Sequence, residues 1–420
     1  MPNHAIGRTA RCVGFIGLIT ACMASLGFAD AAATTVASPG LFVPHQVRIL
    51  DTRNGTGGYT TPMTANVART LVVPGTAGVP TSGVSAVALT VTVVGATSVG
   101  NIAVVPGDAT AFTNGSSLVY NAGDTTSNTA VVALDTTGTL KFVADHSGVN
   151  LVLDLQGYFS TAPSPTAGGY IPVAARRIVD TRTGVGVPAG KVATGDALTI
   201  TPGSRINLPA SAVGVYASIV VINQAGGGYV TTYATGAPPT GSFSLNFDNG
   251  DPQALGTTIP LSSAGQFDVL VAAGGPVDIV VDVEGYFDSA TGAATFAAAQ
   301  SRLYDSRVSP NSVLAAGETR TLTVAGTANI PLPAAGLGAV VVNLTTVNAT
   351  GTTGGNLTAW TAGQPEPAVS SINFGTANSL RSALVLVVPD ASGHISVHNH
   401  TSGPVHLVLD AEGWFHQPSL

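Results

Sequence analysis

Cysteine, lysine and charge of either sign are scarce in this chain of 420 residues. The two cysteines, Cys12 and Cys22, lie in an N-terminal segment with the pattern of an export signal. The region after it must therefore be stabilised by ordinary hydrophobic cores rather than by disulfides. Charged residues make up 9% of the chain, against about 25% in typical soluble proteins. A formal net charge of −7 and sparse basic residues exclude nucleic acid as a partner, because that binding needs clustered Lys and Arg.

Long apolar runs are also missing beyond the N-terminus. No later segment reaches the roughly 18 apolar residues that a transmembrane helix needs, so we expect no transmembrane segment. An arginine-containing start, an apolar stretch ending at Phe28 and small residues after it predict a signal peptide over residues 1–31 and a secreted protein. One alternative stays open, because Ile19-Thr20-Ala21-Cys22 is similar to a lipobox. In that case Cys22 would be lipidated and would anchor the protein to a membrane.

The chain does contain one pair of motifs three times. The opening motif, R-[IL]-x-D-[TS]-R, begins at Arg48, Arg177 and Arg302. The closing motif, D-x-[QE]-G-[YW]-F, ends at Phe159, Phe287 and Phe415, which are 128 residues apart both times. This period exceeds the roughly 20–50 residues of a solenoid or propeller unit and has the size of a whole domain. We therefore predict three tandem domains, over residues 40–160, 168–288 and 294–416.

Each copy alternates apolar and polar residues in short runs, which are broken by many of the 51 glycines and 26 prolines. This period of two is typical of half-buried strands joined by turns. Seven or eight short strands in fewer than 130 residues predict an all-β fold, in which each copy is a β-sandwich with Greek-key or jelly-roll connections. The connections between copies are short, so we expect a semi-rigid rod.

The aspartate of each closing motif lies on the face of its strand opposite the aliphatic residues. The aspartate and last arginine of each opening motif are two residues apart and should also share a face. We predict that the first and last strands of each copy are neighbours, joined by bidentate ion pairs. The predicted pairs are Asp154 with Arg53, Asp282 with Arg182 and Asp410 with Arg307, beside Asp51, Asp180 and Asp305. The glycine of each closing motif predicts a bulge.

These motifs, with an S-x-[LI]-N-F block between them, resemble a repeat of proteins secreted by high-GC Gram-positive, actinobacterial-type bacteria. In those proteins the repeat occurs in tandem arrays or beside wall-active enzymes. The resemblance spans residues 42–416 and implies export and association with the cell surface or matrix. It transfers no catalytic or binding residue. The first copy departs from the middle block, where Val119 stands in place of Asn246 and Asn373.

No motif indicates catalysis or a cofactor: the sequence has no P-loop, dinucleotide-binding glycine pattern, nucleophile elbow or paired-cysteine zinc motif. Each candidate carboxylate comes with an arginine, which should lower its pKa. His394, His398 and His400 would share one face of a strand, and His398 with His400 could chelate Zn²⁺ or Cu²⁺, although solvent-exposed histidines are the default interpretation of the pattern. Tyr233 and Trp360 could stack on a sugar or simply pack.

We therefore predict a non-enzymatic, extracellular protein of the cell surface or matrix, or an adhesion protein, without a cofactor. The alternative is a carbohydrate- or peptidoglycan-binding protein with a weak site in each copy, since repetition raises avidity for a polymer. The expected partners are cell-wall or extracellular polysaccharide, or other surface proteins.

Overall fold

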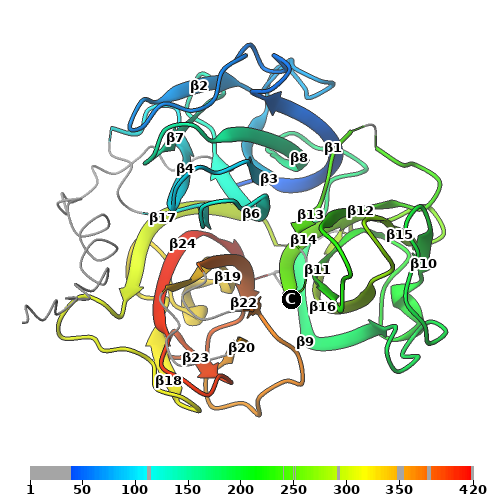
Figure 1. Cartoon of the computed structure of the whole chain (residues 1–420). Coiled ribbons are helices and arrows are strands. Elements are labelled where there is room, and N and C mark those ends of the chain that lie inside the picture. The colour runs from blue at the N-terminus through cyan, green and yellow to red at the C-terminus, as the bar shows by residue number, and fades with distance from the viewer. Residues whose placement is uncertain are drawn as a thin grey trace, which may run out of the picture.

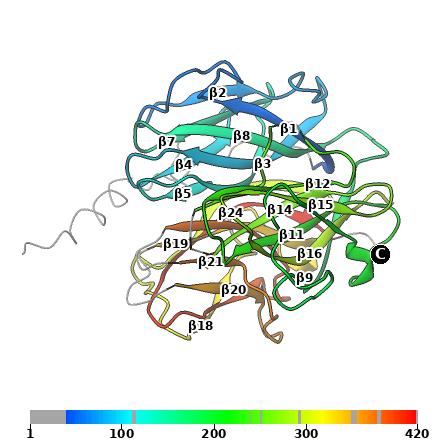
Figure 2. The ribbon, with the colours of Figure 1, turned by 45° about the vertical axis from the view of Figure 1, so that its right-hand side comes forward.

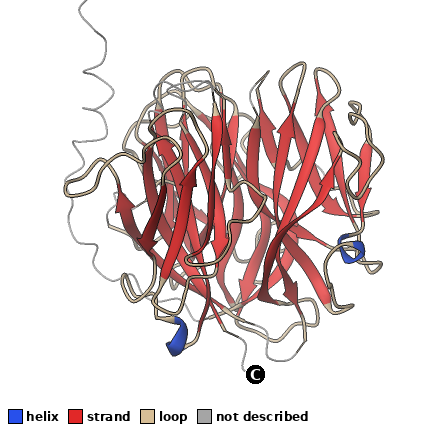
Figure 3. Cartoon of the chain, turned by 90° about the horizontal axis from the view of Figure 1, so that it is seen from below, coloured by secondary structure: helices blue, strands red, loops and turns tan. Residues whose placement is uncertain are grey.

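A computed structural model describes residues 39–110, 115–239, 241–248, 250, 252–290, 294–347, 354–375 and 380–417. The regular secondary structure of this part of the chain is strands joined by loops and turns (Figure 3), apart from two short 3-10 helices, η1 (Pro202–Ser204) and η2 (Pro333–Ala335). The prediction of an all-β protein is confirmed. The predicted signal peptide, with Cys22, lies outside the described residues. In the described ranges no helix has the length and apolarity to cross a membrane.

Each copy contributes eight strands, which form two four-stranded antiparallel sheets. The first copy contains β1 (Leu41–Asp51), β2 (Arg69–Val72), β3 (Val84–Val94), β4 (Gly100–Pro106), β5 (Leu118–Tyr120), β6 (Thr126–Ala133), β7 (Thr139–Ala144) and β8 (Asn150–Ser160). The second contains β9 (Gly169–Asp180), β10 (Ala197–Ile200), β11 (Ala212–Ile222), β12 (Gly228–Ala234), β13 (Leu245–Phe247), β14 (Gln253–Pro260), β15 (Phe267–Ala273) and β16 (Asp278–Asp288). The third contains β17 (Phe296–Asp305), β18 (Thr319–Thr323), β19 (Leu337–Val347), β20 (Gly355–Thr361), β21 (Ile372–Phe374), β22 (Arg381–Val387), β23 (His394–Asn399) and β24 (His406–His416).

The six sheets close into a ring. In the first copy the strand orders are β6-β3-β8-β1 and β5-β4-β7-β2, and the other copies repeat both orders. The edge strands β5, β6, β13, β14, β21 and β22 each contact the next in this series, and β22 contacts β5. Figures 1 and 2 accordingly show the three copies around one centre rather than in a row. This is a six-bladed β-propeller of small sheets, to which each copy contributes two blades.

The prediction of three tandem β-sandwich domains in a rod is therefore wrong. The two sheets of a copy do pack face to face over an apolar core, as neighbouring blades must. The other face of the β1-β8-β3-β6 sheet is also buried, however: Asp154 and Gln156 are no more than 3% exposed. Alternation along a strand identifies its apolar face, but it cannot indicate that a neighbouring copy covers the polar one.

The order of the strands along the chain is a second reason why the repeat length did not indicate a propeller. Within each copy the strands of the two blades are interleaved along the chain, so that β2, β4, β5 and β7 alternate with strands of the other sheet. No single blade is therefore a continuous segment. The sequence repeats only after both blades are complete, at a length typical of a domain.

Aromatic rings from all three copies meet in one central cluster. Phe159, Phe287 and Phe415, which end the closing motifs, pack with rings from the first strand of each copy, and neighbouring ring centroids lie 4.4 to 6.1 Å apart. The rings from those first strands belong to Phe42, Tyr170 and Phe296. All of these side chains are at most 2% exposed. The core at the centre therefore belongs to no single copy.

The glycine of each closing motif lies at a register shift, as predicted; opposite Gly157 the shift falls between Ala88 and Leu89. The structure adds a steric reason for the residue type. A Cβ atom on Gly157 would lie 2.4 Å from the Phe42 ring, and Gly285 and Gly413 face Tyr170 and Phe296 at the same distance. Glycine is needed because a central ring packs directly on the backbone there.

Replacement of Phe287 by alanine should lower the free energy of unfolding by about 3–5 kcal/mol, since it leaves a cavity in a fully buried cluster. Because the cluster is shared, differential scanning calorimetry should show the whole protein melting in one transition at a lower temperature. Val72→Ala, at a 52% exposed position, is the control and should melt like the parent protein. Separate transitions for the three copies would contradict a shared core.

Candidate functional site at the interface between the second and third copies

The opening and closing strands of each copy are neighbours, as predicted: β1 pairs with β8, β9 with β16 and β17 with β24. The ion pairs differ from those predicted. The closing aspartates pair with the first arginine of the opening motif, at Nε–Oδ1 distances of 2.8 Å for Arg48–Asp154, 2.9 Å for Arg177–Asp282 and 2.8 Å for Arg302–Asp410. The last arginines bind the aspartate of their own motif, as Arg53–Asp51, Arg182–Asp180 and Arg307–Asp305.

The predicted pairs of Asp154 with Arg53, Asp282 with Arg182 and Asp410 with Arg307 are therefore wrong. The strand β1 ends at Asp51 and a turn follows, so Arg53 no longer obeys the alternation of a strand. Its guanidinium folds back on the Asp51 carboxylate, with Nε–Oδ1 and Nη2–Oδ2 distances of 2.9 and 2.7 Å. The same turn geometry recurs in the other two copies.

The two sets of aspartates differ electrostatically. The hydrogen bond from Arg53 holds the pKa of Asp51 below its ordinary value, against the effect of burial. At Asp154, Asp282 and Asp410 burial raises the pKa and outweighs the lowering effect of the paired arginine. The expectation that arginine would lower every pKa thus holds for the opening aspartates alone. Both oxygens of each closing carboxylate accept hydrogen bonds from an arginine, which leaves no free carboxylate pair at these positions.

Two of the three interfaces between copies are closed by equivalent hydrogen bonds. In each, backbone N–H groups of one copy donate to an aspartate, a serine and a glutamine or glutamate on the adjacent sheet of its neighbour. Between the second and first copies the bonds are Phe243–Asp154 (3.0 Å), Asn246–Ser127 (3.3 Å) and Thr258–Gln156 (3.0 Å). Between the first and third copies they are Ser116–Asp410 (3.4 Å), Val119–Ser382 (3.1 Å) and Val131–Glu412 (2.6 Å).

The interface between the third and second copies is different, and we call it the open interface because the equivalent hydrogen bonds do not form between its described residues. The equivalent donors are Ser370, Asn373 and Leu386, and the equivalent positions opposite them hold Asp282, Ala254 and Glu284. None of these three hydrogen bonds forms between these described residues. Alanine at 254 has no hydroxyl to accept the N–H of Asn373, whose side-chain amide donates to Ser370 Oγ instead, at 2.8 Å.

Two buried polar groups of the second copy lack, at the open interface, the hydrogen bonds that their counterparts make in the other copies. The Ser218 hydroxyl, opposite Asp282 in the sheet register, is buried without a hydrogen-bond partner in the described ranges. Burial and the nearby Asp282 charge raise the pKa of the Glu284 carboxyl to about 8. Buried polar groups without partners are costly. The open interface thus lacks the bonds that complete the other two.

A cavity of about 440 Å³ occupies the open interface. Val220, Ile222 and Val280 form an apolar part of its wall, and polar side chains converge from both copies. These polar side chains include Arg177, Arg182, Asn356, Asn373, Glu366 and His400. Arg177 is 31% exposed here, whereas its counterparts Arg48 and Arg302 at the closed interfaces are 14% and 23% exposed.

The position of Val119 and the residue that faces it account for part of this difference. At the interface of the first and third copies, Val119 packs into an apolar cluster with Val347, Leu380 and Val408. Asn373 is the counterpart of Val119 and faces Val220 and Val280, which form an apolar cluster with Ala254. The side-chain amide of Asn373 finds no hydrogen-bond partner on that apolar surface. At the closed interface of the second and first copies the same position holds Asn246, whose side-chain amide donates to Ser127 Oγ at 2.7 Å. Asparagine is therefore compatible with a closed interface only where the facing residue is an acceptor, and Ala254 is not.

His400 lines the cavity, and His398 lies beside it. His398 and His400, on and just after β23, have ring centroids 4.0 Å apart, and Glu366 from the β20–β21 connection joins them. Burial raises the pKa of Glu366, but hydrogen bonds with the two imidazoles outweigh it and hold the pKa below its ordinary value. His394 is not in this cluster; its Nδ1 atom lies 3.5 Å from Asp390 Oδ1. Sequence reasoning missed Glu366 because it is distant along the chain.

The aromatic candidates for sugar binding lie elsewhere. Tyr233 is 6% exposed, and the Trp360 indole donates to the Gln364 carbonyl at 2.8 Å. Neither residue lines the cavity at the open interface. Trp414 is partly buried and packs against the core of the third copy, in agreement with a packing role.

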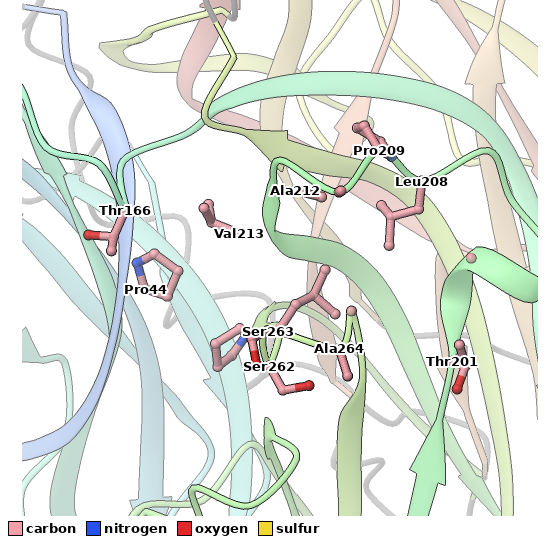
Figure 4. A pocket seen from close by; sticks show the side chains of 15 residues that line it. Pro44, Thr166, Thr201, Leu208, Pro209, Ala212, Val213, Ser262, Ser263 and Ala264 are labelled. Carbon is pink, nitrogen blue, oxygen red and sulfur yellow. The ribbon is translucent and has the colours of Figure 1, made fainter.

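A second cavity, of about 640 Å³, is larger but has no charged residue in its lining. It lies at the junction of the first and second copies, where Pro44 and Thr166 face Leu208, Val213 and the turn at Ser262 (Figure 4). Because few polar groups converge there, the cavity offers little basis for specific recognition.

Comparisons with known proteins add no family. No model of a known protein family matches the chain, and no curated protein is similar to it in sequence. A structure described as the triple jelly roll fold and turret assembly of an archaeal virus aligns with a TM-score of 0.19 at 11% identity, over 90% of this chain and 91% of its own. An atomic structure of Sulfolobus turreted icosahedral virus gives 0.20 at 11% identity, over 91% and 92%. At these TM-scores the likeness establishes neither fold nor function.

Stability should fall as pH rises from about 5 to 8. Burial raises the pKa of both Glu284 and Glu412 to about 8, so the folded state retains protons that the unfolded state releases above about 4.3. Each group should contribute a loss of up to about 1.4 kcal/mol per pH unit in that window. Glu284→Gln, which copies Gln156 at the equivalent position, should roughly halve the slope measured by chemical denaturation. An unchanged slope would show that Glu284 is ionised in the fold.

The closed and open interfaces should respond differently to loss of the closing aspartate. Asp154→Ala breaks a buried ion pair, at a cost of about 3–5 kcal/mol, and also removes the acceptor for the Phe243 N–H, at a further cost of about 1 kcal/mol. Asp282→Ala breaks a pair with a more exposed arginine and has no such acceptor role. Guanidinium denaturation should therefore find Asp154→Ala the less stable variant. An equal decrease in the free energy of unfolding for Asp154→Ala and Asp282→Ala would mean that the closed and open interfaces are equivalent.

Proposed function

We propose that the protein is a non-enzymatic, extracellular protein of the cell surface or matrix, which binds an acidic polysaccharide through the open interface. The observation that carries this proposal is the difference between the three interfaces. Two are closed by three equivalent hydrogen bonds each, whereas the third has a cavity of about 440 Å³ in their place. That volume is within the range of about 300–1,000 Å³ typical of small-ligand sites.

The side chains around the cavity favour an oxygen-rich, anionic ligand. Arg182 uses Nε and Nη2 to bind Asp180, and its Nη1 makes no hydrogen bond to another residue in the described part of the chain. A guanidinium with free donors suits a carboxylate. Asn356 and Asn373 add amide groups, which can both donate to and accept from hydroxyls. No Trp, Tyr or Phe ring lines the cavity, so recognition would rest on hydrogen bonds and charge.

Several features of the chain support an extracellular location and a binding role. The N-terminal sequence has the pattern of a signal peptide, and the motif pair resembles a repeat of secreted surface proteins. The sparse charge suits a surface that hydrogen-bonds to glycans. The carboxylates of the closing motifs are each held by an arginine in two-point contact, which suits a structural role better than hydrolysis.

The propeller changes how many sites we propose. Repetition of the sequence suggested one weak site per copy, whose avidity would favour a polymer. At the two closed interfaces, however, Phe243 and Ser116 occupy the positions next to the ion pairs. We therefore propose one site in the whole protein, and it uses residues of two copies.

The variant Asn373→Val tests this site. It introduces the residue found at the closed interface of the first and third copies, Val119, and should fill part of the cavity against Val220 and Val280. Binding of polygalacturonate by the full chain, measured by affinity electrophoresis, should weaken at least about tenfold, a loss of about 1.4 kcal/mol. The melting temperature should be unchanged or higher, because apolar contact with Val220 and Val280 offsets the loss of the partly buried hydrogen bond to Ser370.

Matched arginine variants separate binding from folding. Arg182→Gln and Arg53→Gln remove the same turn contact in two copies, but only Arg182 lines the cavity. Polygalacturonate affinity should fall for Arg182→Gln alone, while neutral dextran should bind to neither variant nor to the parent. Equal losses for both variants, or co-sedimentation with insoluble peptidoglycan without any polygalacturonate binding, would overturn the acidic-polysaccharide proposal.

A further inference from the structure

Two imidazoles of the third copy are held side by side on one strand. His398 lies on β23, where it pairs with Thr319 of β18 and Thr358 of β20. His400 directly follows the end of β23, where its N–H still donates to the Asn356 carbonyl of β20, and its ring lies 4.0 Å from that of His398. Both side chains are partly exposed, at 21% and 35%. The flanking strands on both sides fix the backbone between them, so the spacing of the two rings is set by the sheet.

A carboxylate from a different part of the chain completes the group. Glu366 lies in the connection between β20 and β21, next to Pro367. One carboxylate oxygen lies 2.8 Å from His398 Nδ1 and the other 2.6 Å from His400 Nε2. One donor atom from each of the three residues lies within 4.8 Å of the others. Three donors this close can bind one ion after small rotamer changes.

We propose that Glu366, His398 and His400 form a binding site for one divalent transition-metal ion, with Zn²⁺ as the best fit. Two imidazole nitrogens and one carboxylate oxygen are a common ligand set for Zn²⁺, at distances of about 2.0–2.2 Å. The nitrogen donors disfavour Mg²⁺ and Ca²⁺, which prefer oxygen ligands. Three protein ligands leave at least one coordination position for water or for an incoming ligand.

The site is specific to the third copy, as the open interface is. The sheet registers place Val143 and Leu270 at the positions that correspond to His398, and Asp145 and Ala272 at those that correspond to His400. No repeat-wide structural role therefore explains the histidine pair. The pattern coincides with the one interface that lacks the hydrogen bonds of the other two.

The metal ion would join two parts of the cavity wall. Glu366 and His400 both line the cavity, and the residues that follow Glu366, through Ser370, form part of its wall. A bound ion would fix this connection to β23 and place a positive charge at the rim, on the side of the cavity formed by the third copy. The metal site rests on these ligands alone and does not depend on the proposed polysaccharide.

The test is a titration of the metal-free full chain with ZnCl₂, followed by isothermal calorimetry, and with CoCl₂, followed by visible absorption. We expect one ion per chain and a Co²⁺ spectrum with d–d bands of nitrogen and oxygen ligands. The double variant His398→Gln/His400→Gln and the single variant Glu366→Gln should each weaken Zn²⁺ binding at least about tenfold. These side chains are partly exposed, so the variants should fold normally, which circular dichroism without metal would verify.

His394→Gln is the matched control, because His394 occupies the same strand and face about 13 Å away from His398. It should bind Zn²⁺ like the parent protein. Unchanged affinity in the double variant, an equal loss in His394→Gln, or the absence of saturable binding would overturn the metal site. Zn²⁺ binding without polygalacturonate binding would support this site and contradict the proposed ligand, so the two proposals fail separately.

Discussion

The ring depends on how the closing aspartate of each copy is satisfied once it is buried. A carboxylate at the polar face of a sheet loses its water when a neighbouring copy covers that face, and this is tolerated only with good partners. The arginine of the adjacent strand supplies two hydrogen bonds from within the copy. At the closed interfaces a backbone N–H of the next copy supplies a further one. The same carboxylate therefore sets the register of β1 against β8 and joins one pair of blades to the next.

All three copies retain the ion pair between the first arginine of the opening motif and the aspartate of the closing motif, whereas their interfaces differ. A serine accepts the incoming N–H at positions 127 and 382, whereas Ala254 stands at the equivalent position of the second copy. At the neighbouring position, Val119 packs on apolar residues and Asn246 donates to Ser127, whereas Asn373 has no acceptor opposite it and donates to Ser370 of its own copy. These are exchanges of a few atoms, yet they decide whether neighbouring blades meet through complete hydrogen bonding or leave a cavity. The proposed polysaccharide site and the proposed metal site both lie where the symmetry is broken.

Much of the local structure could be predicted from the residues. Alternation gave the strands, the paired motifs gave the neighbouring terminal strands, and the glycine before Tyr158 gave the bulge. The predicted partner of Asp154 was wrong because Arg53 lies in a turn, where strand alternation does not apply. The histidine pair was visible as a pattern on one strand. Glu366 was not, since nothing along the chain indicates that the β20–β21 connection lies over those imidazoles.

The sequence by itself determined that the protein is all-β, that it contains three related copies, and which face of each closing strand is apolar. These properties depend on local alternation and on repeats within one chain. Tertiary structure alone decided that the polar face of the sheets is buried, that the copies close a six-bladed ring, and that one interface is open. Those outcomes depend on contacts between residues more than 100 positions apart, such as Phe287 with Phe415 or Thr258 with Gln156. A periodic pattern records which face of a strand is polar, but not what covers that face.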